Sequence, residues 1–215
     1  MDTDIPGIEV AVSREAIVVH STARLRVLSS AVVGGGAADV YWIVNRHIPK
    51  GYRCREPATD LAAFAQSRGI GGPFVGLMTA ALVERAQCVT IRDKELAVCC
   101  IVTAGLSNPS ASGLSPPVEA EAGTINLILL VDASLGEAAM VNAVITATEA
   151  KTAVLAERQT RTAEGFPATG TSTDAVVVAC TGRGVSLPYA GPVTRVGSLI
   201  GRSVRESLGR ALAAR

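Results

Sequence analysis

The sequence predicts an α+β fold, in which a mixed or antiparallel sheet is combined with a central buried helix and flanking helices in one domain spanning residues 1–215. Hairpin patterns at residues 8–20 and 87–103 indicate antiparallel strand pairs. A continuous apolar run at residues 125–131, followed by a long helical pattern, indicates a strand buried on both faces. Strands and helices alternate too irregularly for a doubly wound sheet, and we therefore expect a mixed one.

Composition is that of a well-buried globular protein, with 48% hydrophobic residues and a mean hydropathy of +0.36. A net charge of +1 gives no electrostatic reason to bind nucleic acid or a membrane surface, and 3% aromatic residues argue against base-stacking platforms. No apolar run reaches the roughly 18 residues that a membrane span needs. We expect neither a nucleic-acid partner nor a membrane partner.

The cysteines indicate a reducing compartment. The five cysteines lack CxxC spacing, and for the adjacent Cys99 and Cys100 core packing is favoured over reactivity. The N-terminal residues do not have the pattern of a secretory signal. These features predict a cytoplasmic protein and leave its oligomeric state open, a homo-oligomer included.

The N-terminal half contains several strand patterns and two helical ones. Strands are expected at residues 8–13, 16–20, 25–33, 40–44, 87–92 and 96–103. Pro57 suits the first turn of a helix whose buried face includes Leu61, and Gly69 closes this helix. Residues 74–85, which contain VGLMTAAL, are expected to form a second helix.

The segment from residue 123 to residue 158 is expected to organise the rest of the chain. After its strand, Ser134 and Glu137 form a capping-box pattern at which a helix begins. This helix has almost no polar face, so we expect it to be covered on all sides. Because a charge inside a covered helix is costly unless it is paired or used, Glu149 and Lys151 become candidates for function. They lie about 200° apart around the helix and face different neighbours.

The other segments are loops, a strand and a helix. Residues 104–122 form a Ser/Pro/Gly-rich loop of a length that tends to be functional or mobile. Residues 168–174 lead into an apolar strand at residues 175–180. The apolar face of a final amphipathic helix contains Val196, Leu199, Ile200, Val204, Leu208 and Leu212.

Small polar residues gather at the expected strand ends. Those considered for substrate binding are Ser29, Ser30, Asn45, Thr79, Asn126, Gly170, Thr171 and Thr173. The segment 170–174 (GTSTD) offers N–H groups and hydroxyls that can hold an oxyanion, although the same residues can simply cap a turn. Asn45 and Asn126 can equally bond loop backbone or contact a substrate. GxSxG, HExxH and Walker motifs are absent, and two histidines are too few for a His-rich zinc site.

Several sequence words occur in a specific order and spacing. They are SSAVVGGGAADVYWIVN, GLMTAA, AGLSNP, GTIN, TATEAKTAVL, ATGTSTDAVVVA and YAGPVTRVGSLIGR. Together they resemble the adenosylcobinamide amidohydrolase family of cobamide salvage, over roughly residues 25–208. The succession of GTIN, TEAKT and TGT-x-TDA is the most specific part, and in it Ser172 stands where a glycine-like residue is expected.

This resemblance implies hydrolysis of the amide that joins the aminopropanol arm to the corrinoid ring of adenosylcobinamide, in cobalamin salvage. The implied products are adenosylcobyric acid and aminopropanol or its phosphate-bearing form. The corrinoid is then a small-molecule substrate, so no cofactor and no resident metal are expected. The alternatives are a non-catalytic corrinoid-binding module and an Ntn-type self-processing amidase.

The first catalytic hypothesis is a carboxylate base. Glu149 would activate water, Asp174 or Lys151 would position it or protonate the leaving amine, and N–H groups of residues 170–173 would hold the oxyanion. The competing interpretation is that Glu149 and Lys151 each pair with a neighbour such as Arg161 or Asp174 for structural reasons.

The second hypothesis is a hydroxyl nucleophile. Thr124, Thr79 or Ser30 would attack the amide carbon, with Lys151 as the base. In the self-processing variant, cleavage between Gly123 and Thr124 would expose Thr124 as an N-terminal nucleophile.

Overall fold

The computed structural model of the protein describes residues 1–117 and 123–213. Within these residues one sheet has the strand order β4-β3-β2-β11-β8-β6-β5, with β1 paired to β2. Its strands are β1 (Ile8–Val12), β2 (Ala16–Ser29), β3 (Gly36–His47), β4 (Phe74–Thr79), β5 (Gln87–Asp93), β6 (Leu96–Ala104), β8 (Ile125–Val131) and β11 (Ala175–Cys180). The helices are α1 (Pro57–Ser67), α2 (Glu137–Glu157) and α3 (Arg195–Ala213), with a 3-10 turn η1 (Val83–Arg85). Short strand pairs join β7 (Pro109–Ser110) to β10 (Gly170–Thr171) and β9 (Ser134–Leu135) to β12 (Ser186–Leu187).

The sheet is mixed, which confirms the predicted α+β class. Strand β2 runs antiparallel to β1, β3 and β11, and β6 runs antiparallel to β5 and β8. Parallel pairs join β11 to β8 and β3 to β4. The strand patterns predicted at residues 16–20 and 25–33 belong to one strand, β2, whose register shifts between His20 and Leu25.

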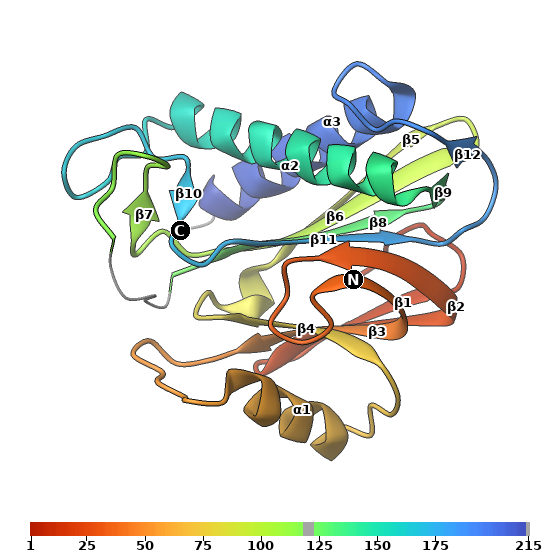
Figure 1. Cartoon of the computed structure of the whole chain (residues 1–215), viewed down its shortest axis with the longest axis horizontal. Coiled ribbons are helices and arrows are strands. Elements are labelled where there is room, and N and C mark those ends of the chain that lie inside the picture. The colour runs from red at the N-terminus through yellow and green to blue at the C-terminus, as the bar shows by residue number, and fades with distance from the viewer. Residues whose placement is uncertain (118–122, 214–215) are drawn as a thin grey trace.

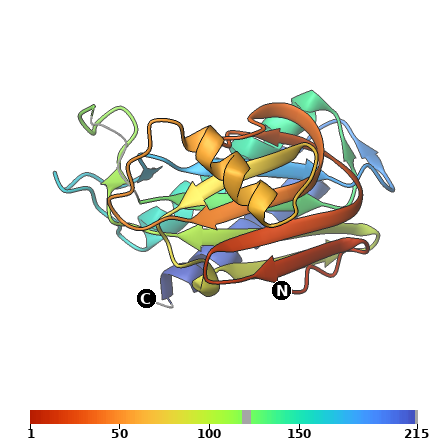
Figure 2. The same ribbon diagram turned by 90° about the horizontal axis from the view of Figure 1, so that it is seen from below.

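The sheet curls so that its two halves face each other (Figure 1). Side chains of β1–β4 pack against Cys99, Ile128 and Val177 from the facing half. Alternate residues of these facing strands, such as Cys100 and Leu129, pack against α2 and α3 instead. Helix α1 covers the outer side of the half formed by β2, β3 and β4. Figure 2, which views the molecule from below, shows α1 lying across these strands. The core packing predicted for Cys99 and Cys100 is confirmed, since both are buried.

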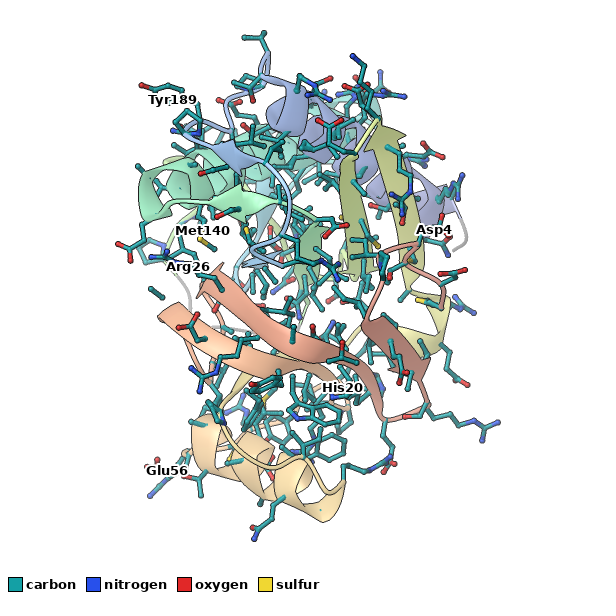
Figure 3. All side chains as sticks on the ribbon, turned by 90° about the vertical axis from the view of Figure 1, so that its right-hand side faces the viewer. Asp4, His20, Arg26, Glu56, Met140 and Tyr189 are labelled. Carbon is teal, nitrogen blue, oxygen red and sulfur yellow. The ribbon has the colours of Figure 1, made fainter. Side chains whose placement is uncertain are left out.

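Helix α2 differs from the prediction at its start and on one side. It begins at Glu137 after Gly136 without a side-chain cap, because Ser134 is used in β9. The expectation that the helix is covered on all sides is wrong, because Val141 is 49% and Ile145 48% exposed. In Figure 3, Met140 of this helix lies toward the sheet. The apolar character comes largely from alanine, which packs closely on the sheet but does not require burial when it faces water.

The helix predicted at residues 74–85 is wrong. Strand β4 and the one-turn η1 occupy that segment, and β4 pairs with β3 at the sheet edge. A side chain at Gly76 would collide with Leu61 of α1, whose Cδ2 is 2.6 Å from the position of an added Cβ. Strand pairing and this contact override the helix propensity of Leu, Met and Ala.

The C-terminal helix agrees with its sequence pattern, since all six residues of the predicted apolar face of α3 are buried. Residues 118–122 of the predicted loop at 104–122 lie outside the described part of the chain. None of the helices in the described ranges has the length and apolar character to cross a membrane.

Candidate active site

A cleft of about 1240 Å³ opens at the edge of the sheet where β4 ends and β8 and β11 begin. Six of the residues predicted for the site line it: Ser30, Thr79, Thr124, Asn126, Thr173 and Asp174. The remaining candidates do not line it. They are Ser29, Asn45, Glu149, Lys151, Gly170 and Thr171. The curl of the sheet therefore brings together residues from four separate segments of the chain.

The floor of the cleft is a chain of amide hydrogen bonds between the two halves of the sheet. Asn126 Nδ2 donates to Asn45 Oδ1 and to the carbonyl of Met78, each at 3.0 Å, and Asn45 Nδ2 donates to Thr103 Oγ1 at 3.0 Å. Asn126 is 1% exposed, and its Oδ1 has no hydrogen-bond partner among the described residues. An unsatisfied buried acceptor costs about 1–3 kcal/mol, so the other bonds of Asn126 must offset this cost. Asn45 supports this floor from outside the cleft.

A buried ion pair between Lys151 and Asp174 lies beside the cleft. Asp174 Oδ2 contacts Lys151 Nζ and accepts from the N–H of Thr171 at 3.1 Å, and Oδ1 accepts from the N–H of Ile125 at 2.9 Å and the hydroxyl of Thr171 at 2.5 Å. The structural pairing weighed for Lys151 is thus present. Because both oxygens of Asp174 already accept two bonds, this carboxylate positions its neighbours.

The same ion pair explains Gly170. A Cβ at this position would lie 2.4 Å from Asp174 Oδ2 and 2.7 Å from Lys151 Nζ. The N–H of Thr171, predicted to help hold an oxyanion, is directed at Asp174 instead. The turn 170–174 is therefore fastened to the start of β8 and fixes the position of Thr173.

Thr124 and Thr173 form a hydroxyl pair in the cleft, with their Oγ1 atoms 2.5 Å apart. Thr173 Oγ1 also donates to the carbonyl oxygen of Gly123 at 3.1 Å. Since each hydroxyl has one proton, Thr173 gives its proton to Gly123 and accepts that of Thr124. The lone pairs of Thr124 Oγ1 consequently remain available to a reacting carbon.

Glu149 lies on the exposed side of α2 and makes no hydrogen bond or ion pair with the described residues. The premise that it is buried in a covered helix is wrong, because the side of α2 that carries Glu149 and Ile145 faces water. Lys151 faces the other way, toward Asp174, as the 200° separation predicts. The structure gives Glu149 no route to a substrate in the cleft.

A loop at residues 48–56 forms one wall of the cleft and was not predicted to belong to the site. It contributes Lys50, Arg53 and Arg55, which make no ion pair with described residues. Its sequence, KGYRCR, has three cations in six residues, but such runs usually lie on a solvated surface. Only the curl of the sheet shows that this run faces Thr79 and Asn126.

The loop is anchored to α1 through Asp60. Tyr52 donates its hydroxyl hydrogen bond to Asp60 Oδ2, and Arg46 Nη1 lies 2.8 Å from the same oxygen. The hydrogen bond from Tyr52, and then the charge of Arg46, hold the pKa of Asp60 below its ordinary value. Burial, followed by the bond to Asp60, raises the pKa of Tyr52.

Replacing Asp60 by asparagine is expected to loosen this loop, since both bonds to a charged acceptor weaken. Trypsin should then cut after Arg53 and Arg55 several-fold faster than in the wild-type protein, as followed by mass spectrometry. Asp132→Asn, which disturbs the pair with Arg183 at the opposite end of β8, is the matched control and should leave the rate unchanged. Equal cutting of both variants would contradict the anchor.

Acid is also expected to loosen loop 48–56, because it protonates Asp60. The pKa of Asp60 is lower in the folded protein than in the unfolded chain, so its contribution is complete above about pH 4 and is lost as the pH falls through the folded value.

A second cavity, of about 500 Å³, adjoins the cleft and shares Lys50, Ala80 and Ser107 with it. His47 and Arg85 line this cavity, and the Nδ1 of His47 lies 3.0 Å from the carbonyl oxygen of Ala81. The described residues contain no group of three or more His, Cys, Asp or Glu side chains that could hold a metal ion.

Comparison with known proteins identifies the family. A sequence model of the family described as adenosylcobinamide amidohydrolase matches residues 1–215. The chain belongs to this family. The predicted family, and its class as an enzyme that hydrolyses an amide bond, are thereby confirmed.

The relatives agree with this assignment. The chain is 36% identical over 184 residues to an adenosylcobinamide amidohydrolase of Methanosarcina mazei, covering 81% of the chain and 84% of that protein. It is 41% identical over 120 residues to one of Halobacterium salinarum, covering 53% of the chain and 49% of that protein. The crystal structure of the PH0078 protein from Pyrococcus horikoshii OT3 shares the fold, with a TM-score of 0.52 at 12% identity over 97% of this chain and 80% of that one.

Proposed function

We propose that this protein hydrolyses the amide bond between the aminopropanol arm and the corrinoid ring of adenosylcobinamide, giving adenosylcobyric acid and aminopropanol in cobalamin salvage. Family membership supports the reaction class. The observation that carries the proposal to this site is the cleft of about 1240 Å³ in which the hydroxyl-bearing residues Thr124 and Thr173 lie together beside Asn126.

The cleft has the size and polarity that a corrinoid requires. A corrin ring is large and flat, is apolar on its faces, and carries amide arms around its rim. Small polar side chains such as Thr79 and Thr124 allow such a ring to approach and can form hydrogen bonds with its amide arms. The cations of loop 48–56 can donate to amide oxygens at the rim.

Thr124 is the residue that we assign to the reacting carbon. Its hydroxyl lies in the cleft and gives its hydrogen bond to Thr173, which is held in turn by the Gly123 carbonyl. Asp174, which is paired with Lys151, directly follows Thr173 and accepts a hydrogen bond from the N–H of Ile125, which directly follows Thr124. The ion pair therefore fixes the positions of both threonines. The hydroxyl hypothesis is therefore better supported than the carboxylate hypothesis, which needs Glu149 in the cleft.

The decisive experiment is turnover of adenosylcobinamide by the purified protein. Release of aminopropanol and formation of adenosylcobyric acid, both followed by mass spectrometry over many turnovers, are expected. Stoichiometric binding of the corrinoid without release of aminopropanol would instead support a binding module and would refute the proposal.

The double substitution Arg53→Gln and Arg55→Gln is expected to raise KM about tenfold with little change in kcat. The reason is the loss of charged hydrogen bonds to the rim of the substrate, made equally in the ground state and the transition state. Steady-state kinetics with adenosylcobinamide measure both constants. Arg92→Gln, at an exposed position of β5 outside the cleft, is the control. A large fall in kcat would show that the loop takes part in the chemistry.

A further inference from the structure

We infer that the chain cleaves its own peptide bond between Gly123 and Thr124, leaving Thr124 as the N-terminal residue of a second fragment. The inference concerns a modification of the chain itself. It rests on the proposed function in one respect: the new α-amine of Thr124 would act as the base for the Thr124 hydroxyl in the proposed amide hydrolysis. The geometry on both sides of this bond points to it.

The carbonyl of the bond is already activated by a donor. Thr173 Oγ1 donates to the Gly123 oxygen at 3.1 Å, in the position of a group that stabilises negative charge when the carbonyl carbon is attacked. Gly123 is closely surrounded, because an added Cβ would lie 2.0 Å from Asn108 Oδ1 and 2.4 Å from Ser107 Oγ. Any residue larger than glycine before Thr124 would displace these side chains.

The attacking group adjoins this carbonyl. Thr124 Oγ1 belongs to the residue directly after the bond, and its proton is directed to Thr173. In the cleavage step a bond forms between Thr124 Oγ1 and the Gly123 carbon, the C–N bond breaks, and the hydroxyl proton passes to the nitrogen. Water then hydrolyses the resulting ester, which leaves a Gly123 carboxylate, a free Thr124 hydroxyl and a free amine.

This cleavage supplies a base within Thr124 itself, whereas His47 lines only the adjoining cavity and its Nδ1 lies 3.0 Å from the Ala81 carbonyl oxygen. Among the described residues that line the two cavities, Asp174 is the only carboxylate, and its oxygens are fully used. Lys151 is the cationic partner of Asp174 and has no lone pair to accept a proton. An α-amine ordinarily titrates near about 7.7–8.0, so an N-terminal Thr124 would have its own base at neutral pH.

The new terminus would stay in place after cleavage. The Thr124 carbonyl accepts from the N–H of Gly105 at 3.0 Å, and the N–H of Ile125 donates to Asp174. From Ile125 onward the chain is buried in β8, between β6 and β11. These contacts keep the amine and the hydroxyl of Thr124 beside Thr173 and Asn126.

Intact-mass spectrometry of the purified full-length chain tests the inference. We expect two fragments, residues 1–123 and 124–215, whose masses add up to the full chain plus one water. N-terminal sequencing of the second fragment should give Thr-Ile-Asn. Hydroxylamine, which attacks esters, should accelerate cleavage. A wild-type chain that remains intact after incubation with hydroxylamine would overturn the inference.

Variants make the result specific. Thr124→Ala should remain a single chain, Thr124→Ser should still be cleaved, and Thr173→Val should be cleaved more slowly because the carbonyl loses its donor. Thr148→Ala, on the exposed side of α2, is the matched control and should be cleaved like the wild type. Thermal melting of each variant verifies that it is folded. Cleavage of Thr124→Ala at the same bond would refute self-cleavage and indicate a contaminating protease.

The outcome separates the inference from the proposed function. An intact chain that turns over adenosylcobinamide would refute the self-cleavage and support the proposed hydrolase activity. A cleaved chain that releases no aminopropanol would support the self-cleavage and refute the proposed hydrolase activity.

Discussion

Asp174→Ala will be the most destabilising single substitution at the site, lowering the free energy of unfolding by about 3–5 kcal/mol. The substitution leaves the charge of Lys151 buried without its partner, since the Lys151 side chain is only 8% exposed. It also removes the acceptor of the N–H groups of Ile125 and Thr171. Denaturant unfolding measures the change directly, and the melting temperature should fall by roughly 6–20 °C.

A double variant distinguishes the orphaned charge from a general packing defect. Lys151→Met combined with Asp174→Asn removes both charges and should recover at least half of the lost stability, because no unpaired ion remains. If the double variant is as unstable as the single one, the ion pair is not the source of the effect. Activity should stay low in both variants, since Thr173 and the start of β8 lose their common anchor.

Thr124→Ala will lower kcat for adenosylcobinamide hydrolysis by at least about 10³-fold while leaving the protein folded. The hydroxyl that attacks the amide carbon is removed, whereas the backbone bonds of residue 124 to Gly105 remain. Stopped assays of aminopropanol release, together with a melting curve, establish both parts of this prediction.

The companion variants identify which property of Thr124 matters. Thr124→Ser keeps a hydroxyl and should retain activity within about tenfold, whereas Thr124→Val keeps the shape and should be as inactive as alanine. Thr148→Ala serves again as the control. Full activity of Thr124→Val would rule out a hydroxyl nucleophile at this position and return attention to activated water.

Much of the fold could be predicted because its signals are local. Strand β8 is a short apolar run, the β5–β6 hairpin consists of two runs of strand-forming residues joined by a turn, and α3 has a regular apolar face. Segment 74–85 could not be predicted in this way, because strand pairing with β3 and contact of Gly76 with α1 decide its conformation. These are long-range effects that no window of sequence contains.

Part of the candidate site could also be predicted, because the signal for those residues is local. Small polar residues at strand ends identified Thr79, Thr124, Asn126 and Thr173, because a polar group at the end of a buried strand needs a partner there. The burial predicted for Glu149 was wrong because large apolar residues of α2, Val141 and Ile145, face water, so an apolar helix pattern did not mean burial on every side. The cations of loop 48–56 were missed because their sequence is that of an ordinary surface loop.

The hydrogen bond between Asn45 and Asn126 joins residues that are 81 positions apart in the chain. The corrinoid substrate that we propose would bind only the folded protein, because the cleft above this bond exists only there, so mass action would tie stability to substrate supply. At a ligand concentration 100 times Kd, the folded state gains about 2.7 kcal/mol. Cellular proteases act mainly on unfolded chains, and the abundance of this protein should therefore rise and fall with the corrinoid available to it.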